Sequence, residues 1–365
     1  MSPEHVQEDV AAGSHVVERF GVAGEEDRFA VAHEERGLAV TGSEQPERPQ
    51  PRVVALKFGG SSLLGAERMS HAASLVHSAT RNSSVIVVVS AMKGVTDRLL
   101  FLSRLLAGGK LSRARNEAEA IIHLHVDVLQ DLQLDEQRQD HVRRALQLLS
   151  SDLLHEIPQE ASVEATPELS DRLASFGERF SSRLFAAALE KFGIPAVPVS
   201  SSDFVLTCDT FRDAKPQLEQ TRERGREILI PLLEDGLVPV VTGFIGATPD
   251  GRITTLGRNS SDFSGAIIAH LVDAEELVIW TDVDGLYTAN PHVSAEAKLL
   301  HDLSYDEAHA LAASGAKVLH PHVLPLAAET EMTIWIRNTF KPHVRGTRIG
   351  LPRNSNDLAG SGGVA

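Results

Sequence analysis

The sequence predicts a three-layer α/β/α sandwich built around a mostly parallel central sheet. Short, mostly apolar runs rich in β-branched residues recur along the chain, and stretches with helical periodicity separate them. The runs do not alternate regularly with polar residues, which is typical of strands buried on both faces of a parallel sheet. Strands that alternate with helices favour helices on both faces of such a sheet.

Three strands are expected in the first half of the folded region, because each is a short apolar run ended by glycine or polar residues. They are residues 53–58, 85–90 and 196–199. Segments with apolar positions at helical spacing lie between them. They are residues 66–79, 96–154 with breaks near Gly108-Gly109 and Leu134-Asp135, and 174–192.

The second half continues this alternation. Its expected strands are residues 238–242, 276–281 and 333–337. Its expected helices are residues 218–234, 261–271 and 305–314. In an open parallel sheet, the loops that leave the carboxyl ends of the strands form the ligand-binding crevice, so functional residues are expected in those loops.

The first 50 residues differ from the rest in composition. They carry eleven acidic side chains against four arginines, so almost half of the formal net charge of -15 lies there. Because the segment has few large apolar residues, residues 1–52 are expected to be a mostly disordered extension, with a helix from about 6 to 20 as the alternative. The predicted folded domain is 53–350, and the polar tail 351–365 is expected to be flexible.

Composition excludes several classes of protein. The excess of acidic groups argues against nucleic acid as a partner, because binding its backbone requires clustered lysine and arginine. The apolar run at 85–89 is far too short to cross a membrane, and no membrane association is expected. The single Cys208 excludes an intramolecular disulfide and fits a reducing compartment. We therefore expect a soluble cytoplasmic protein.

The loop after the first strand could bind an anion. Lys57 lies near the end of that strand, and Gly59 and Gly60 allow backbone N–H groups to approach phosphate oxygens. The loop is not a Walker A motif, since Ala66-Glu67 stand where Lys-Ser/Thr is required. A tight strand-to-helix turn without a ligand is the alternative.

A second loop, residues 257–262, leads into a predicted helix whose N-terminus favours an anion. Arg258 could hold a carboxylate in a bidentate contact, and Asp262 could bind an ammonium group or orient a metal or a lysine. The alternative is an ordinary capped helix with Ser260 or Ser261 at the N-cap.

Two later loops carry further charged groups. Asp282 and Asp284 follow a strand and could hold ribose hydroxyls or a Mg²⁺ shell, although the same spacing occurs in Asx turns. Lys317 follows Gly315, and alone it would be a solvated surface charge. The paired histidines, 123 with 125 and 320 with 322, lack carboxylate or cysteine partners, so packing or surface roles are favoured over a metal site.

Together and in this order, the four loops resemble those of the aspartate kinase (aspartokinase) catalytic domain of the amino acid kinase family. Further matching motifs are residues 90–97, 176–181, 242–246 and 345–350. The likeness covers about 53–350 and implies an amino acid kinase-like fold, with the acceptor lobe mainly in 53–235 and the nucleotide lobe mainly in 236–350. It implies that ATP phosphorylates the side-chain carboxylate of L-aspartate, the first step toward lysine, threonine and methionine.

The resemblance also implies roles for individual residues. Catalytic residues would be Lys57, Gly60 and Asp262. Substrate-binding residues would be Ser61, Thr96, Glu178, Arg258 and Ser261. Nucleotide-binding residues would be Lys57, Gly59, Gly60, Thr281, Asp282, Asp284, Tyr287 and Lys317. ATP would mainly hold the Mg²⁺ ion, and no residue is predicted as its direct ligand. For Glu178 the alternative is a salt bridge with Arg179 or Arg183.

The sequence departs from the family pattern in two loops. Asn290-Pro291-His292 replaces the usual Asp-Pro-Arg, and Asn259-Ser260 replaces two glycines. The chain also ends soon after the predicted kinase domain, so no ACT-domain feedback site is expected unless a separate regulatory chain supplies it; a homodimer is expected from the resemblance. The alternatives are a kinase of this fold with another carboxylate or phosphonate acceptor, and a non-catalytic nucleotide-binding partner subunit.

Overall fold

The computed structural model describes residues 52–158, 164, 166–258, 260–289, 293–294, 296–313, 319–320 and 322–352. These residues belong to one compact unit, residues 51–365. The predicted N-terminal extension, apart from Arg52, and the tail after Pro352 lie outside the described residues.

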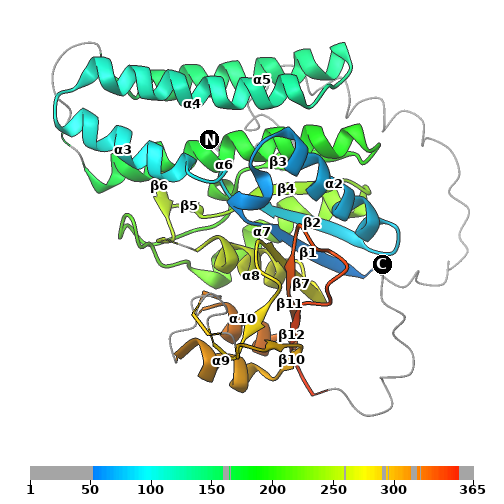
Figure 1. The fold of residues 1–365 in the computed structure, drawn as a ribbon. Coiled ribbons are helices and arrows are strands. Elements are labelled where there is room, and N and C mark those ends of the chain that lie inside the picture. The colour runs from blue at the N-terminus through cyan, green and yellow to red at the C-terminus, as the bar shows by residue number, and fades with distance from the viewer. Residues whose placement is uncertain are drawn as a thin grey trace, which may run out of the picture. The chain divides into compact units, whose positions relative to one another are not determined.

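The unit is built on an eight-stranded sheet (Figure 1). From one edge to the other its strands are β10 (Asp302–Leu303), β12 (Thr347–Ile349), β11 (Thr333–Asn338), β7 (Glu276–Thr281), β1 (Val53–Phe58), β2 (Ser84–Val89), β4 (Val238–Thr242) and β3 (Ala196–Val199). All neighbouring strands in this sheet run parallel except β11 and β12. The prediction of a mostly parallel sheet is confirmed.

Helices cover both faces of the sheet. On one face are α2 (Ala66–Thr80), α3 (Val95–Ala107), α4 (Leu111–Asp131), α5 (Glu136–His155) and α6 (Pro167–Lys191), with α4 and α5 as an outer pair (Figure 1). On the other are α7 (Leu218–Glu234), α8 (Ser261–Leu271), α9 (Tyr305–Ala313) and α10 (Val323–Glu329). Leu56 and Phe58 pack with the first group, whereas Ala55 and Ile279 pack with the second. The three-layer sandwich is therefore confirmed.

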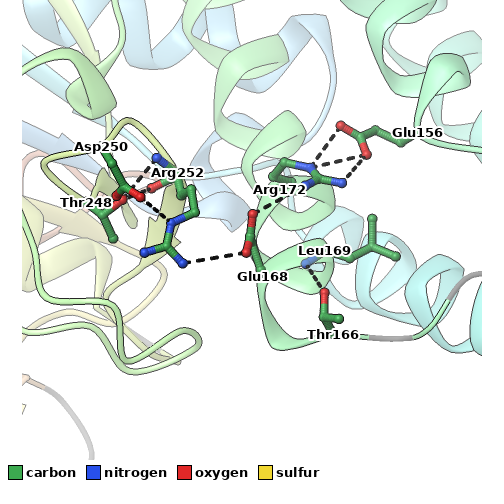
Figure 2. Close-up of polar contacts among 8 residues, drawn as sticks. All are labelled: Glu156, Thr166, Glu168, Leu169, Arg172, Thr248, Asp250 and Arg252. Carbon is green, nitrogen blue, oxygen red and sulfur yellow. Dashed lines mark hydrogen bonds and ion pairs between the residues drawn. The ribbon is translucent and has the colours of Figure 1, made fainter.

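Short elements that the sequence pattern did not predict complete the fold. They are η2 (Gly60–Leu63), η3 (Ser201–Asp203), β5 (Ile245–Ala247), β6 (Ile253–Thr255), β8 (Leu286–Tyr287), β9 (Leu299–Leu300), β10, β12 and α10. The strands among them have only two or three residues, too few to show a period. The predicted helix start at residue 174 is wrong, because α6 begins at Pro167, where the hydroxyl of Thr166 accepts the N–H of Leu169 at 3.1 Å (Figure 2).

Successive strands are added first on one side of β1 and then on the other. From β1 the chain reaches β2 through α2, whereas from β4 it crosses back to β7 with α8 on the opposite face. The loops that leave β1 and β7 therefore diverge, and this is the position where open α/β sheets bind ligands. Within the described residues, none of the helices combines the length and the apolar character of a membrane span.

Candidate active site

A buried lysine and an aspartate meet at the carboxyl end of β1. The Nζ atom of Lys57 lies 2.6 Å from Oδ1 of Asp262, and the two side chains are 8% and 19% exposed. Lys57 reaches the first turn of α8 because Gly265 lies beside its stem, where an added Cβ would be 3.2 Å from the Cβ of Lys57. A cation shielded from water requires such a partner. Two side chains that belong to separate loops in the sequence thus form one pair.

The turn after β1 packs against the loop that follows β2. A Cβ added to Gly60 would lie 2.5 Å from the carbonyl oxygen of Ala91, so a side chain does not fit there. The N–H of Gly59 donates to the carbonyl of Trp280 at 3.1 Å and is used in the fold. Within the described residues, the N–H groups of Gly60 and Ser61 have no such acceptor. Of the N–H groups of Gly59, Gly60 and Ser61, the last two are therefore available to a ligand.

Glu178 is a buried carboxyl with one unused oxygen. Its Oε1 accepts the N–H of Ala91 at 2.9 Å, and its Oε2 has no hydrogen-bond partner in the described part of the chain. Burial raises the pKa of Glu178 to about 8, although the Ala91 hydrogen bond and the charge of Lys57 act in the opposite direction. Glu178 is therefore mostly protonated at pH 7 without a ligand, and its Oε2 could accept a hydrogen bond from a cationic group that displaces this proton.

Among the residues that the structure describes, no side chain caps the N-terminus of α8. Ser260 occupies the N-cap, but its hydroxyl donates to the carbonyl of Gly257 at 2.7 Å and does not cap the helix. The first N–H groups of α8 are therefore available to an anion. This arrangement differs from the ordinary capped helix that was the alternative.

Arg258 rests in an exposed ion pair beside this helix end. Its Nη2 lies 2.6 Å from Oδ1 of Asp97 on α3, and the side chains are 77% and 74% exposed. Such pairs contribute little free energy in water, so a ligand carboxylate could replace Asp97 at small cost. Thr96 precedes Asp97, Ser261 begins α8, and both are half-buried. Four of the predicted acceptor-site residues thus lie on α3, α6 and the start of α8.

The loop after β7 carries two aspartates in different settings. Asp284 accepts a hydrogen bond from Nδ2 of Asn338 at 2.5 Å and pairs with Nζ of Lys341 at 3.1 Å. Burial alone would raise the pKa of Asp284, but these donors hold it below its usual value. Asp282 is exposed, and its Oδ2 lies 4.0 Å from Nζ of Lys93. Asp284 therefore fastens the loop to the turn after β11, while Asp282 stays open to a ligand.

The structure describes only some of the remaining residues that were predicted to bind the nucleotide. Oγ1 of Thr281 lies 3.4 Å from Oδ1 of Asp282, and Tyr287 is half-buried in β8. Lys317, Asn259 and residues 290–292 lie outside the described residues, so their roles stay predictions. The described residues contain no group of three or more His, Cys, Asp or Glu side chains that could hold a metal ion.

Three of the four paired histidines make packing contacts, and His123 is exposed. The ring of His125 is buried and stacks on Phe180 with centroids 4.5 Å apart. His320 and His322 each pack against Phe263, with centroids 5.3 Å apart. These contacts agree with the packing role expected from the sequence.

A cavity of about 420 Å³ lies away from the strand ends, between α5, α6 and β6. Its lining includes Arg172, Phe176 and Arg179, and none of the residues predicted to bind substrate or nucleotide. The candidate site is thus a set of loops at the carboxyl edge of the sheet, and the cavity is not part of it.

Sequence reasoning missed three residues that shape the site: Ala91, Asp97 and Gly177. Ala91 contributes only its N–H, and a Cβ on Gly177 would lie 2.6 Å from the Cβ of Ala91, so glycine lets α6 approach this loop. All three lie inside the matched motifs 90–97 and 176–181. A main-chain donor and a missing side chain leave no chemical signal by themselves, so those motifs were the only indication.

Comparison with known proteins gives the family. The model of the amino acid kinase family matches residues 52–338. The chain belongs to the amino acid kinase family. Among curated members, lysine-sensitive aspartokinase 3 of Escherichia coli is 32% identical over 298 residues, covering 81% of this chain and 64% of that protein. Aspartokinase 1, chloroplastic, of Arabidopsis thaliana is 32% identical over 331 residues, covering 89% and 56%.

Solved structures of the same family are similar. Escherichia coli aspartokinase III in complex with aspartate and ADP has a TM-score of 0.72 and 31% identity, covering 83% of this chain and 65% of that one. The same enzyme in complex with lysine and aspartate has a TM-score of 0.73. This amino acid kinase chain spans 64% and 56% of the two curated relatives named above, so it corresponds to part of their length.

Proposed function

We propose that this protein transfers the γ-phosphoryl group of ATP to the side-chain carboxylate of L-aspartate, giving 4-phospho-L-aspartate and ADP. The observation that carries the proposal is the buried Lys57–Asp262 pair together with Glu178, a buried carboxyl on which the charge of Lys57 acts and whose Oε2 has no hydrogen-bond partner among the described residues. Similarity to proteins named aspartokinases, one of them solved with aspartate and ADP, supports it.

The reaction needs no general base, because the acceptor carboxylate is already ionised at neutral pH. One of its oxygens attacks the γ-phosphorus, and the bond from that phosphorus to the β,γ-bridging oxygen breaks, so ADP leaves with the bridging oxygen. The obstacle is repulsion between two anions. Catalysis of phosphoryl transfer therefore depends on alignment and on positive charge and N–H donors around the transferring group.

Lys57 and the N–H groups of Gly60 and Ser61 supply these donors. Asp262 fixes the ammonium group of Lys57 at the end of β1, which reduces the reorganisation needed during the reaction. Gly59 shapes the turn but offers no N–H donor to the ligand, because its N–H is hydrogen-bonded to the carbonyl of Trp280.

The acceptor is held by both of its α-substituents. Arg258 would exchange Asp97 for the α-carboxylate, and Glu178 would accept hydrogen bonds from the α-ammonium group through Oε2. Thr96 and Ser261 border this position and offer hydroxyl groups. An acceptor held at one end in this way presents its other carboxylate toward Lys57.

The nucleotide would lie along the loop after β7. Thr281, Asp282 and Tyr287 would contact it, Asp284 would hold the loop in place, and Lys317 would reach the phosphates. Mg²⁺ would be carried by ATP, and the exposed carboxylate of Asp282 could contact its water shell. When bound, it would neutralise part of the phosphate charge.

The test is a hydroxylamine trap. Purified protein with ATP, Mg²⁺ and aspartate is expected to form aspartyl hydroxamate, and Lys57→Met is expected to lose this activity at least ~100-fold because a donor to the transferring group is removed. Lys110→Met, at an exposed lysine that precedes α4, is the matched control and should keep full activity. No hydroxamate from the wild type would overturn the function, and full activity in folded Lys57→Met would remove Lys57 from the mechanism.

The alternative is that the protein phosphorylates an acceptor other than aspartate. Measuring ADP release with glutamate, N-acetylglutamate and UMP tests it. Asn259-Ser260 in place of two glycines motivates this panel. Ser260 is fully buried and bonded to Gly257, so it adds no side chain to the acceptor position. Ser260 therefore gives no reason to expect an acceptor of different shape. The homodimer and the separate regulatory chain stay predictions from the sequence.

A further inference from the structure

Asp171 is a buried carboxylate that the proposed reaction does not use. It lies on α6 two turns before Glu178, on the same side of the helix, and is 1% exposed. Burial raises the pKa of Asp171 even though hydrogen-bond donors act against this change. An apolar side chain would pack at such a position at lower cost, so the contacts of the carboxylate indicate its purpose.

The carboxylate binds two segments that are distant in sequence. Oδ2 accepts the N–H of Arg212 at 2.8 Å and the N–H of Thr255 at 2.9 Å. Oδ1 accepts the hydroxyl of Thr255 at 2.9 Å. Arg212 has a φ of 72°, a left-handed conformation that is unfavourable for a side-chain-bearing residue and that this hydrogen bond helps to hold.

These two segments lead directly to the proposed acceptor residue Arg258. Thr255 ends β6, and the chain turns at Gly257, which has a φ of 91°, to place Arg258 before α8. The Arg212 turn packs on this glycine, because a Cβ added to Gly257 would lie 3.0 Å from Oδ1 of Asp213. A displacement of either segment would therefore move Arg258.

Ala174 of α6 packs with Ile245 of β5 in a small buried apolar cluster, whereas the ion pair between α6 and the β5–β6 hairpin is more accessible to solvent. Arg252 of the hairpin points toward Glu168 of α6 (Figure 2). Its Nη1 lies 3.8 Å from Oε2 of Glu168, and its Nε lies 2.8 Å from Oδ2 of Asp250 within the hairpin. The side chains of Arg252 and Glu168 are 39% and 30% exposed, so their ion pair is weakened by water and salt. Asp171, by contrast, is buried and accepts its hydrogen bonds from the hairpin away from solvent.

We propose that Asp171 is a positioning residue that holds the Arg212 turn and the end of β6 on α6. It thereby sets the spacing between Arg258 and Glu178, the two groups that hold the acceptor. The proposal rests on the proposed function for the nature of the acceptor, but not for the geometry. It makes the acceptor site, and not the nucleotide loop after β7, dependent on this carboxylate.

The experiment compares Michaelis constants in Asp171→Ala, Asp171→Asn and the matched control Glu168→Gln. Asp171→Ala is expected to raise the KM for aspartate about 10-fold or more, with the KM for ATP changed less than about twofold, because only one substrate site is displaced. Asp171→Asn is expected within about threefold of the wild type, since its carbonyl can accept both N–H groups while its amide nitrogen donates to the Thr255 hydroxyl. Glu168→Gln should match the wild type.

If Asp171→Ala does not fold, Thr255→Val replaces it, since this change removes only the hydroxyl donor and should raise the KM for aspartate about threefold. Equal rises in both KM values, an unchanged KM for aspartate in a folded variant, or no recovery in Asp171→Asn would each overturn the proposal. If the wild type proves to use another acceptor, the proposed function fails. The change in the KM for that acceptor, compared with the change in the KM for ATP, still decides the role of Asp171.

Discussion

The protonation of Glu178 is expected to affect both the stability of the protein and its binding of substrate. Its pKa is about 8 in the folded protein, against an ordinary value of 4.5, and burial is the main cause. The folded state therefore holds a proton that the unfolded state releases between these two pH values. Stability is highest below pH 4.5 as far as this group is concerned, and it falls as the pH rises toward 8.

The magnitude follows from the size of the shift. Each pH unit inside this window costs about 1.4 kcal/mol of unfolding free energy, so this group removes roughly 3 kcal/mol by pH 7. Glu178→Gln abolishes the titration. Its carbonyl can still accept the N–H of Ala91, and its unpaired amide nitrogen adds a cost of about 1–3 kcal/mol that does not vary with pH.

The assay is urea unfolding at pH 5.5, 6.5 and 7.5. Between the first and last pH, the wild type is expected to lose roughly 2–3 kcal/mol relative to Glu178→Gln. The control is Glu168→Gln on the same helix, where the side chain is 30% exposed and the pH dependence should match that of the wild type. Parallel pH curves for wild type and Glu178→Gln would refute the argument, because they would mean that no proton is held at this position.

Binding provides a second measurement of the same proton. An incoming ammonium group favours the ionised carboxylate, so Glu178 should release its proton when aspartate binds. With a pKa of about 8, the group is roughly nine-tenths protonated at pH 7, so close to one proton should appear per bound aspartate. Calorimetry in buffers of different ionisation enthalpy measures this number. A value near zero would show that Glu178 does not face the ammonium group.

Three further predictions follow from individual contacts. Gly60→Ala should lower the unfolding free energy by about 1–3 kcal/mol and reduce activity, because its Cβ would lie 2.5 Å from the Ala91 carbonyl; thermal unfolding and turnover test this. Arg258→Gln should raise the KM for aspartate about 10- to 100-fold while Asp97→Asn does not raise it, as steady-state kinetics would show. Burial lowers the pKa of His125 to about 4, so stability is lost as the pH falls from 6.5; His125→Phe should reduce this loss by about 3 kcal/mol in acid unfolding curves.

Much of the fold was predictable because its strands and helices are long and regular. The bounds of β1, β4, β7, α7 and α8 agree with the sequence patterns, since apolar runs and glycine turns mark both ends. The ligand-side loops were also predictable, because a parallel sheet brings the carboxyl ends of its strands to one edge. The elements that escaped prediction, such as β5, β6 and α10, are shorter than the windows in which a period can be recognised.

The contacts within the site were only partly predictable. The sequence allowed Asp262 to orient a lysine, and the structure places it 2.6 Å from Lys57. It did not show that the N–H of Gly59 is used by Trp280, or that Arg258 rests on Asp97. Those contacts join residues far apart in the chain, and single-sequence patterns contain only local information.

The two buried carboxyls of α6 show why burial alone does not identify function. Asp171 and Glu178 lie on the same side of the helix, are nearly equally buried, and have raised pKa values for the same reason. Asp171 accepts three hydrogen bonds, all from the protein, whereas Glu178 accepts one and leaves Oε2 without a partner among the described residues. A carboxylate with donors on both oxygens stabilises a fixed geometry, and one with a free oxygen can gain a partner from a ligand. The number of protein donors therefore separates the positioning carboxylate from the one proposed to bind substrate.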